Sequence, residues 1–338
     1  MQAPSTPVSL HEVHTDYVEW LRLTQDLSKH TVRAYISDTR MFVLSIGEET
    51  TPANIDGRSM RSFFEHQRTT GRRSSTLRRR ACGVRSFCGY LVRAGHLDVD
   101  PWATSEITFR RVRTLPRAIS LREVNQLIQH LCERARVRHG ATVLELPQVQ
   151  PATTLLATTL MVTTGMRVGE LVATRVEDVD VDRSVIRIMG KGQRERVVFV
   201  TDPWIQGLLD RYIDRRAQLS LPHAHLLFNA RLSPMSTAGI RDRVARASQD
   251  AGLSRRVTPH MLRHTAATQL IESGVDIRFV QRLLGHASLT TTEIYTHVSN
   301  AALRSAITNA QVLNRAMTPE PNGTGGRTCS VAGGIARD

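Results

Sequence analysis

Lysine is almost absent from this chain of 338 residues. Of its 45 lysines and arginines, only Lys29 and Lys191 are lysines. A genomic preference for arginine explains that ratio, but it does not explain a formal net charge of +14. An excess of positive charge on this scale favours a polyanionic partner, and nucleic acid is the first candidate.

Cysteines and long apolar runs are also scarce. Cys82, Cys88, Cys132 and Cys329 form no CxxC pair and no Cys/His pair with zinc-site spacing, which argues against a zinc module. We expect reduced thiols, with Cys82 and Cys88 as core residues of one helix. No apolar run is long enough to span a bilayer, and the N-terminus lacks the apolar segment of a signal peptide. We therefore expect a cytosolic protein.

Clustered carboxylates are missing as well. Asp178, Asp180 and Asp182 alternate along a predicted turn and have no further acidic companions. Two-metal nucleases need such companions to hold their ions. We expect no metal and no other cofactor.

The N-terminal third has the periodicity of helices. Apolar residues recur three and four positions apart in the segments 17–23, 31–46, 59–71 and 76–95. Ser28 is suited to cap the second helix, and Gly71 and Gly95 stand where the third and fourth should end. We predict a small all-helical domain over residues 11–105. Its basic side chains are candidate DNA contacts: Lys29, Arg33, Arg72, Arg73, Arg78, Arg79 and Arg80.

A second domain, residues 119–305, is predicted beyond a basic, proline-containing linker at 106–118. Two β-branched runs flank the turn "GKGQ" between Val179 and Thr201, which indicates a β-hairpin. The fold class is therefore mainly α with a small β-sheet. The predicted helices of this domain cover 121–136, 151–165, 205–219, 237–252, 258–274 and 277–285.

Residues 306–338 are predicted to be a C-terminal segment. It begins within a further helix predicted at 302–316 and ends in a disordered tail. The helix has a partly apolar face, which suits packing on its own chain or docking on a neighbouring copy equally well.

Two segments combine basic residues with helix starts. In "TTGMRVGEL", residues 163–171, a helix ends at Gly165 and the next places Arg167 in its first turn. In "TPHMLRHTAATQL", residues 258–270, Thr258 and Pro259 begin a helix whose first turns present His260 and Arg263 on one face. Such a helix start attracts anions, and a histidine and an arginine there suit a phosphate. Taken alone, Arg167 is more simply a surface residue of an arginine-rich chain.

A third segment, "LLGHASLTTTEIYTH", follows at residues 283–297. His286 lies in a turn after Gly285, and Tyr295 falls early in a short helix. Alone, Tyr295 is more simply a packing residue. Together, however, two arginines, two histidines, a lysine and a tyrosine form a complete set for phosphodiester transesterification: phosphate ligands, a nucleophile, a base and an acid.

The three segments resemble the two signature boxes of the tyrosine recombinases, also called phage-type integrases. The motifs are "TGMRVGEL" and "HMLRHTAATQLIESGVDIRFVQRLLGHASLTTTEIYTH", and "LSKHTVRAY" resembles the start of the family's helical core-binding (SAM-like) domain. The resemblance covers about residues 11–305. It implies a site-specific DNA recombinase of two domains, in its Xer-like form. The resemblance assigns the catalytic set as Arg167, Lys191, His260, Arg263, His286 and Tyr295.

The resemblance also implies the roles. Tyr295 attacks the scissile phosphate and forms a 3′-phosphotyrosine link, without ATP or a metal. The two arginines and His286 hold the phosphate, His260 is the expected base and Lys191 the expected acid. Glu170 supports the arginines, and we expect neighbouring His264 to be a structural, hydrogen-bonded histidine.

The implied partners are duplex DNA with specific core sites and further copies of the chain, four in the synaptic complex. A related recombinase can also be a partner in that complex. The short lead before the first helix leaves no room for an arm-binding domain, which favours a Xer-like resolvase or a compact recombinase of a mobile element. The alternatives are a type IB topoisomerase or telomere resolvase, and a DNA-binding factor without catalysis.

Lys191 is the residue that composition singles out. Arginine is a poor proton donor because its pKa exceeds about 12, whereas the pKa of a lysine among like charges falls. The glycines on either side suit a mobile hairpin tip. Lys29 shows that lysine also persists where no acid is needed.

Overall fold

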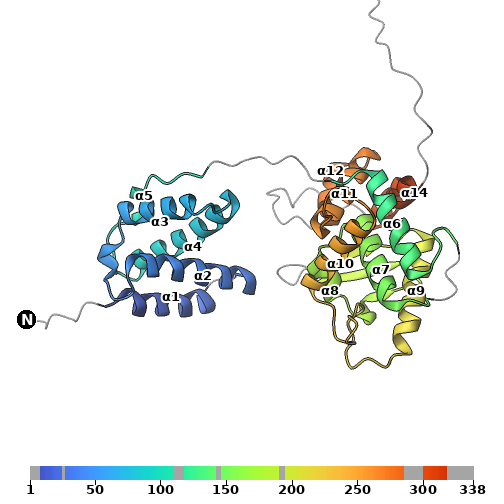
Figure 1. Cartoon of the computed structure of the whole chain (residues 1–338), viewed down its shortest axis with the longest axis horizontal. Coiled ribbons are helices and arrows are strands. Elements are labelled where there is room, and N and C mark those ends of the chain that lie inside the picture. Colours follow the sequence, from blue (N-terminus) through green and yellow to red (C-terminus); the bar gives the residue numbers. More distant parts are fainter. Residues whose placement is uncertain are drawn as a thin grey trace, which may run out of the picture. The chain divides into compact units, whose positions relative to one another are not determined.

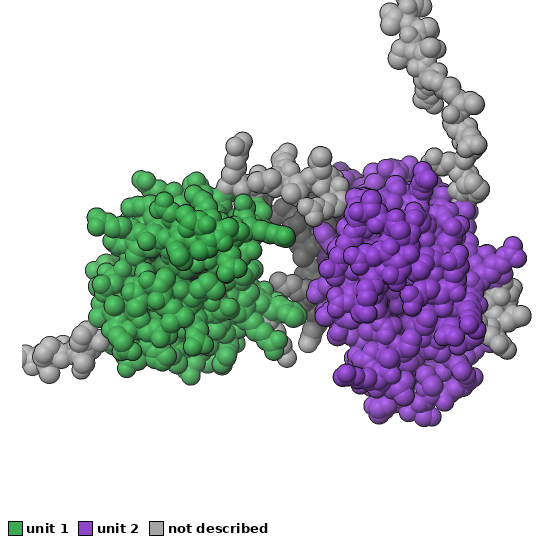
Figure 2. Space-filling view, in the orientation of Figure 1, with its two compact units in different colours: residues 1–114 green, residues 115–338 purple. Residues whose placement is uncertain are grey.

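A computed structural model describes residues 8–24, 27–109, 118–141, 146–189, 195–284 and 300–317. The chain divides into two compact units, residues 1–114 and 115–338, shown in green and purple in Figure 2. The division falls within the segment predicted as the linker. Each unit has a hydrophobic core of its own.

The described part of the first unit is helical, which confirms the four helices predicted there (Figure 1). The helices are α1 (Leu10–Thr24), α2 (Lys29–Ile46), α3 (Gly57–Thr69), α4 (Ser74–Arg93) and α5 (Pro101–Thr104), with a 3-10 turn, η1 (Pro52–Asn54).

The helix ends follow the sequence signals. The Ser28 hydroxyl accepts a hydrogen bond of 3.1 Å from the backbone N–H of Thr31, which is the predicted cap of α2. Gly71 and Gly95 follow the ends of α3 and α4 with φ of +74° and +76°. Glycine adopts this left-handed conformation without the strain that other residues incur.

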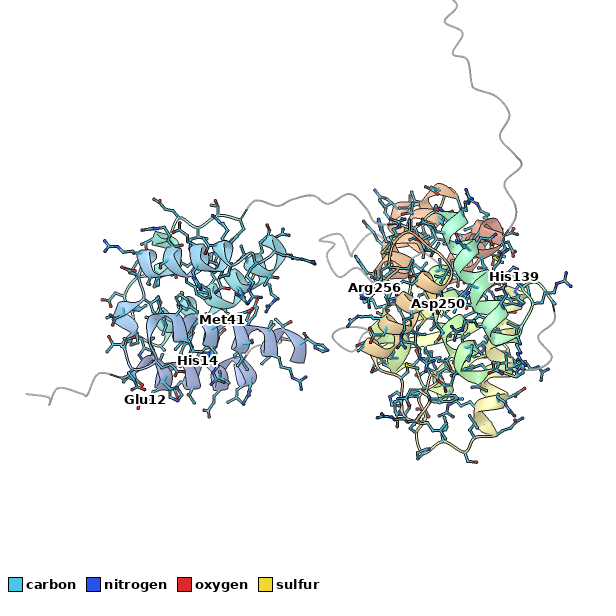
Figure 3. The ribbon with its side chains drawn as sticks, in the orientation of Figure 1. Glu12, His14, Met41, His139, Asp250 and Arg256 are labelled. Atoms are coloured by element: carbon cyan, nitrogen blue, oxygen red, sulfur yellow. The ribbon has the colours of Figure 1, made fainter. Side chains whose placement is uncertain are left out.

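The core of the first unit joins α1 to α2 and α4. His14, labelled on α1 in Figure 3, shares a hydrogen bond of 2.8 Å with the Thr39 hydroxyl of α2. Cys88 is buried in this core as predicted, but Cys82 is exposed, so that prediction was wrong for Cys82. Six helical residues turn through about 600°, which places the two cysteines on different faces of α4.

The second unit surrounds its longest helix, α7. The described helices are α6 (Leu121–Ala135), α7 (Val149–Thr164), α8 (Val168–Ala173), α9 (Pro203–Ala217), α10 (Thr237–Asp250), α11 (Pro259–Glu272), α12 (Ile277–Leu284), α13 (Asn300–Ala310) and α14 (Val312–Met317), with a 3-10 turn, η2 (Val176–Asp178). The helices predicted in this unit's described residues are therefore confirmed.

Helix α7 is buried on nearly all sides although it is rich in threonine. Its hydroxyls donate to carbonyls one turn earlier, for example from Thr158 to Thr154 at 2.8 Å and from Thr164 to Leu160 at 2.6 Å. This pairing satisfies the buried hydroxyls. Helix α7 packs against α6, α9 and α11, and this packing fixes its C-terminal end at Gly165.

The predicted hairpin is present as an antiparallel sheet of three strands in the order β1-β2-β3. The strands are β1 (Val179–Asp180), β2 (Val185–Met189) and β3 (Glu195–Phe199). The first predicted β-branched run is thus divided by a turn into β1 and β2. Met189 pairs with Glu195, so the two long strands lead directly into and out of residues 190–194.

The C-terminal helices pack on their own unit. The helical conformation is interrupted between α13 and α14 at Gln311, where φ is +40°. Ile307 and Val312 are buried with α12 residues, and Leu313 joins the main core. The segment packs on its own unit in this structure, and docking on a neighbouring copy stays a prediction. No described helix combines the length and the apolar character needed to cross a membrane.

Candidate active site

The turn between α7 and α8 places the first predicted site residue. Gly165 ends α7 with φ of +67°, and a side-chain carbon added to it would lie 2.4 Å from Leu284 Cδ2 at the end of α12. Arg167 is the N-cap of α8, and its backbone N–H donates to Glu170 Oε2 at 2.7 Å. The ends of α7 and α12 and the start of α8 therefore meet at one place.

Helix α11 brings the second arginine to the same place. Thr258 caps the helix through the backbone N–H of Met261, and Pro259 is its first residue, as predicted. Arg263 is 8% exposed, and its guanidinium donates to the carbonyls of Gly165 and Leu284. His260 is exposed one turn earlier on α11.

The charge of Arg167 acts on the guanidinium of Arg263. The pKa of Arg263 is lowered to about 10, mainly by burial and also by the positive charge of Arg167. Arg263 remains charged at neutral pH, because its pKa still lies well above 7. The site thus holds two cations close together before any ligand is bound.

Glu170 is the carboxylate that lies against these charges. Its Oε1 accepts from Arg167 at 2.8 Å, and its two oxygens each accept from Arg196 at 2.8 Å. Burial opposes its ionisation, but the hydrogen bonds from Arg196 and Arg167 outweigh burial and lower the pKa of Glu170 to about 2. Glu170 is therefore ionised at any physiological pH.

Arg196 was missed by sequence reasoning. It lies on β3, 26 positions from Glu170 along the chain, and its Nε also donates to the carbonyl of Leu283 at 3.1 Å. Among 43 arginines no local pattern distinguishes it. The available signal was its place in the strand that follows the Lys191 turn.

Three of the predicted catalytic residues, Lys191, His286 and Tyr295, lie outside the described residues. Their neighbours along the chain are described. Strands β2 and β3 bracket residues 190–194, and α12 ends at Leu284, directly before residues 285–299.

His264 is half-buried on α11. Its Nε2 is buried and has no hydrogen-bond partner among the described residues. The expected hydrogen bond is therefore not found at this nitrogen.

The candidate DNA contacts of the first unit differ in exposure. Arg33, Arg72, Arg73 and Arg79 are exposed, and Arg78 is half-buried; nothing is described of the Lys29 side chain. Arg80 is buried at 6% exposure, donates to Gln67 and lies 3.6 Å from Asp38. A DNA contact is not proposed for Arg80, because its guanidinium is buried against Gln67 and Asp38.

Comparison with protein families matches both units. Residues 117–302 match the phage integrase family, and residues 15–95 match the N-terminal SAM-like domain of phage integrases. The chain belongs to the phage integrase family. It is a tyrosine-type site-specific recombinase, an enzyme that cleaves and rejoins DNA strands. The predicted family, fold class and activity are thereby confirmed.

Curated relatives of this recombinase match over most of its length. Tyrosine recombinase XerC of Corynebacterium glutamicum is 32% identical over 307 residues, which are 90% of this chain and 93% of that protein. Tyrosine recombinase XerC of Mycobacterium tuberculosis is 34% identical over 293 residues, covering 86% and 95%. Tyrosine recombinase XerD of Halalkalibacterium halodurans is 28% identical over 295 residues, covering 85% and 93%.

Solved structures share the fold. The XerH site-specific recombinase bound to its difH substrate has a TM-score of 0.65 at 21% identity, over 90% of this chain and 98% of that one. The Tn1549 transposon integrase in complex with transposon end DNA has a TM-score of 0.67 at 14% identity, over 88% and 98%.

Among the described residues, no group of three or more His, Cys, Asp or Glu side chains is placed to hold a metal ion.

Proposed function

We propose that this recombinase cuts each DNA strand through a 3′-phosphotyrosine link at Tyr295, without a metal or ATP. The joint placement of Arg167, Arg263 and Glu170 carries the proposal. Helices α8 and α11 supply two guanidinium groups from positions 96 residues apart in the chain, and both belong to one charge network. Arginine forks suit the oxygens of a phosphodiester.

The charge of the cluster supports this chemistry. Arg167, Arg196 and Arg263 carry three positive charges against the one negative charge of Glu170, which leaves a formal charge of +2. A phosphodiester carries one negative charge in its ground state and gains a second as an oxygen nucleophile adds to it. An arrangement fixed in advance of that charge stabilises the transition state more than the ground state.

The other tyrosines support Tyr295 as the nucleophile. Tyr17 and Tyr212 are fully buried, and burial raises the pKa of each to about 12. Tyr35 and Tyr90 belong to the first unit, whereas the arginine cluster belongs to the second, and burial raises their pKa values too. Tyr295 follows Leu284, the residue whose carbonyl Arg263 holds, by 11 positions.

In the proposed reaction, Arg167, Arg263 and His286 hold the scissile phosphate while Tyr295 attacks phosphorus. His260 takes the phenolic proton, and Lys191 protonates the departing 5′ oxygen. The 5′-hydroxyl of a partner strand then attacks the phosphotyrosine and releases Tyr295. The energy of the phosphodiester bond is retained throughout, so the cycle needs no external energy source.

We further propose that the partner is duplex DNA with specific core sites and that four copies assemble on two sites. A lambda integrase tetramer of the same fold is bound to a Holliday junction, with a TM-score of 0.66 at 18% identity. The 32–34% identity to XerC proteins favours a Xer-like role in resolution or mobile-element exchange. The linker at 106–118, the domain bounds of 11–105 and 119–305, and a cytosolic location remain part of this proposal.

The test is covalent trapping on DNA. Duplexes with a random core and a nick are incubated with the protein, and strands that remain attached in detergent are recovered and sequenced. The wild type should enrich a core site, and Tyr295→Phe should bind that selected duplex without forming an adduct. No adduct with the wild type would sink the proposal. Relaxation of supercoiled DNA that lacks the selected site would favour a topoisomerase instead.

A further inference from the structure

Arg196 joins three elements of the second unit through one side chain. From strand β3 its two terminal nitrogens donate to the two oxygens of Glu170 on α8, each at 2.8 Å. Its Nε donates to the carbonyl of Leu283 on α12 at 3.1 Å. All three guanidinium nitrogens are therefore engaged, and each faces a different acceptor atom.

Each of these elements leads into a part of the proposed machinery. Strand β3 begins at Glu195, directly after the 190–194 segment that carries Lys191. Helix α8 carries Arg167, which shares Glu170 with Arg196. Helix α12 ends at Leu284, directly before the segment that carries His286 and Tyr295.

The end of α12 is held by two arginines. Arg196 binds the carbonyl of Leu283 and Arg263 binds the carbonyl of Leu284. The last carbonyls of a helix have no partner within the helix and carry partial negative charge. Two cationic donors at this point fix where the chain leaves α12 toward His286.

Arg196 is poorly placed to contact DNA. Its side chain is 16% exposed, and its fork is closed on Glu170, which is 8% exposed. Glu170 accepts four hydrogen bonds, two from Arg196 and two from Arg167, so both of its oxygens are fully used. Removing Arg196 leaves Glu170 with Arg167 alone, and the carboxylate is then free to draw Arg167 away from the phosphate position.

We propose that Arg196 is a positioning residue that holds strand β3, Arg167 and the C-terminal end of α12 in register for strand cleavage. The inference rests on the proposed function, because it assigns Arg196 to the site where that reaction occurs. Arginine is required there because only a planar fork with a third donor at Nε binds a carboxylate bidentately and a carbonyl at once.

The experiment compares DNA affinity with the rate of cleavage. The probe is the nicked duplex selected with the wild type. Its dissociation constant is measured by fluorescence anisotropy, and the single-turnover rate of adduct formation is measured at saturating protein. Arg196→Gln should bind within about threefold of the wild type and cleave about 100-fold more slowly, the loss expected of a misplacement near 1 Å. Arg196→Lys, which keeps the charge but loses the fork, should lose about tenfold.

Arg216 provides a matched control in the same unit. It is 9% exposed, and it donates to the carbonyls of His223 and His225 rather than to Glu170, Leu283 or Leu284. Arg216→Gln also removes a buried, carbonyl-binding arginine, so it reports the general cost of such a loss. Its cleavage rate, corrected for the folded fraction, should stay within about threefold of the wild type.

Coupling between Arg196 and Glu170 provides a second readout. If Arg196 acts through Glu170, the double variant Glu170→Gln, Arg196→Gln should cleave no more than about threefold slower than the slower single variant. The inference is overturned if Arg196→Gln and Arg216→Gln cleave at equal rates. It is also overturned if Arg196→Gln loses affinity as much as rate, or if the two single losses multiply. Absence of a wild-type adduct would instead refute the proposed function, and the inference would fall with it.

Discussion

Asp38 in the first unit and Glu170 in the second each lie against two arginines, yet their pKa values move in opposite directions. The pKa of Asp38 is raised because burial outweighs the charges of Arg79 and Arg80. The pKa of Glu170 is lowered to about 2, because hydrogen bonds from Arg196 and Arg167 outweigh burial.

The number of well-placed donors accounts for the difference. Glu170 accepts four hydrogen bonds of 2.7–2.8 Å, including one from a backbone N–H. Asp38 accepts one side-chain hydrogen bond from Arg79, whereas Arg80 Nε lies 3.6 Å from Asp38 Oδ1 and has no hydrogen-bond partner among the described residues. An ion pair without good hydrogen bonds repays little of the cost of burying its charges.

The contrast separates two uses of arginine in one arginine-rich chain. Around Asp38, the buried charge of Arg80 serves packing between α2, α3 and α4. Around Glu170, Arg167 and Arg196 donate to the carboxylate, and Arg263 donates to backbone carbonyls at the ends of α7 and α12. The second arrangement retains the excess positive charge that a phosphate requires, and the first belongs to the unit that carries none of the predicted catalytic residues.

The largest expected difference is between Arg263→Gln and Arg80→Gln. Loss of a donor that stabilises developing charge should slow single-turnover adduct formation about 10³-fold in Arg263→Gln. Arg80→Gln should destabilise the first unit but cleave within about threefold of the wild type per folded molecule. The rates are measured on the selected nicked duplex. Equal losses in the two variants would remove the distinction between the clusters.

Lys191→Arg extends the comparison to the hairpin. The substitution keeps the charge but replaces the expected proton donor, so cleavage should slow about 10²-fold while DNA affinity is retained. A substrate with a 5′-thio leaving group needs little protonation and should recover most of the rate. The matched control is Lys29→Arg, which should change neither rate. A defect that is equal on both substrates would contradict the role of Lys191 as acid.

The two carboxylates should respond oppositely to pH. Glu170 has a folded pKa of about 2 against an ordinary 4.5, so its contribution of about 3 kcal/mol is present above pH 4.5 and is lost as the pH falls toward 2. The stability of the wild type relative to Glu170→Gln should therefore shrink on acidification.

Asp38 has a raised pKa, so its ionisation opposes folding as the pH rises above the ordinary value of 3.8. The stability of the wild type relative to Asp38→Asn should shrink in that direction. Hydrogen exchange mass spectrometry in urea measures the free energy of unfolding of each unit separately. A shift in the same direction for both residues would contradict the assignment.

The smallest effect concerns single surface arginines. Arg33→Gln removes an exposed charge, and if it contacts a phosphate the slope of log affinity against log salt should fall by about 1. Arg80→Gln should leave the slope unchanged, because its charge is buried. Anisotropy titrations between low and physiological salt measure both slopes. An unchanged slope in Arg33→Gln would remove it from the proposed contacts.

Local signals in the sequence were sufficient for most of the fold. Ser28, Thr258 and Gly165 predicted their helix boundaries because a cap or a left-handed glycine depends on adjacent residues alone. The burial of Arg80 was predictable too. It lies three residues after Leu77 and four before Val84, on the buried face of α4.

Long-range pairing was not predictable from one sequence. The fork of Arg196 on Glu170 depends on how β3 approaches α8, and nothing near either residue specifies the other. The packing of α13 and α14 on their own unit likewise depends on tertiary contacts, since the same apolar face would also suit docking on a neighbouring copy. The motifs could identify Arg167, Arg263 and Glu170 as candidates. They could not identify Arg196, whose hydrogen bonds lower the pKa of Glu170.

The most direct test of the central claim is to locate the DNA link on the protein. The wild-type adduct on the selected nicked duplex is digested with nuclease and trypsin, and the modified peptide is sequenced by mass spectrometry. Cleavage after Arg282 and Arg304 yields a peptide in which Tyr295 is the single tyrosine. A nucleotide carried through its 3′ phosphate on Tyr295 is the predicted result. A nucleotide on any other residue of the chain would contradict the account.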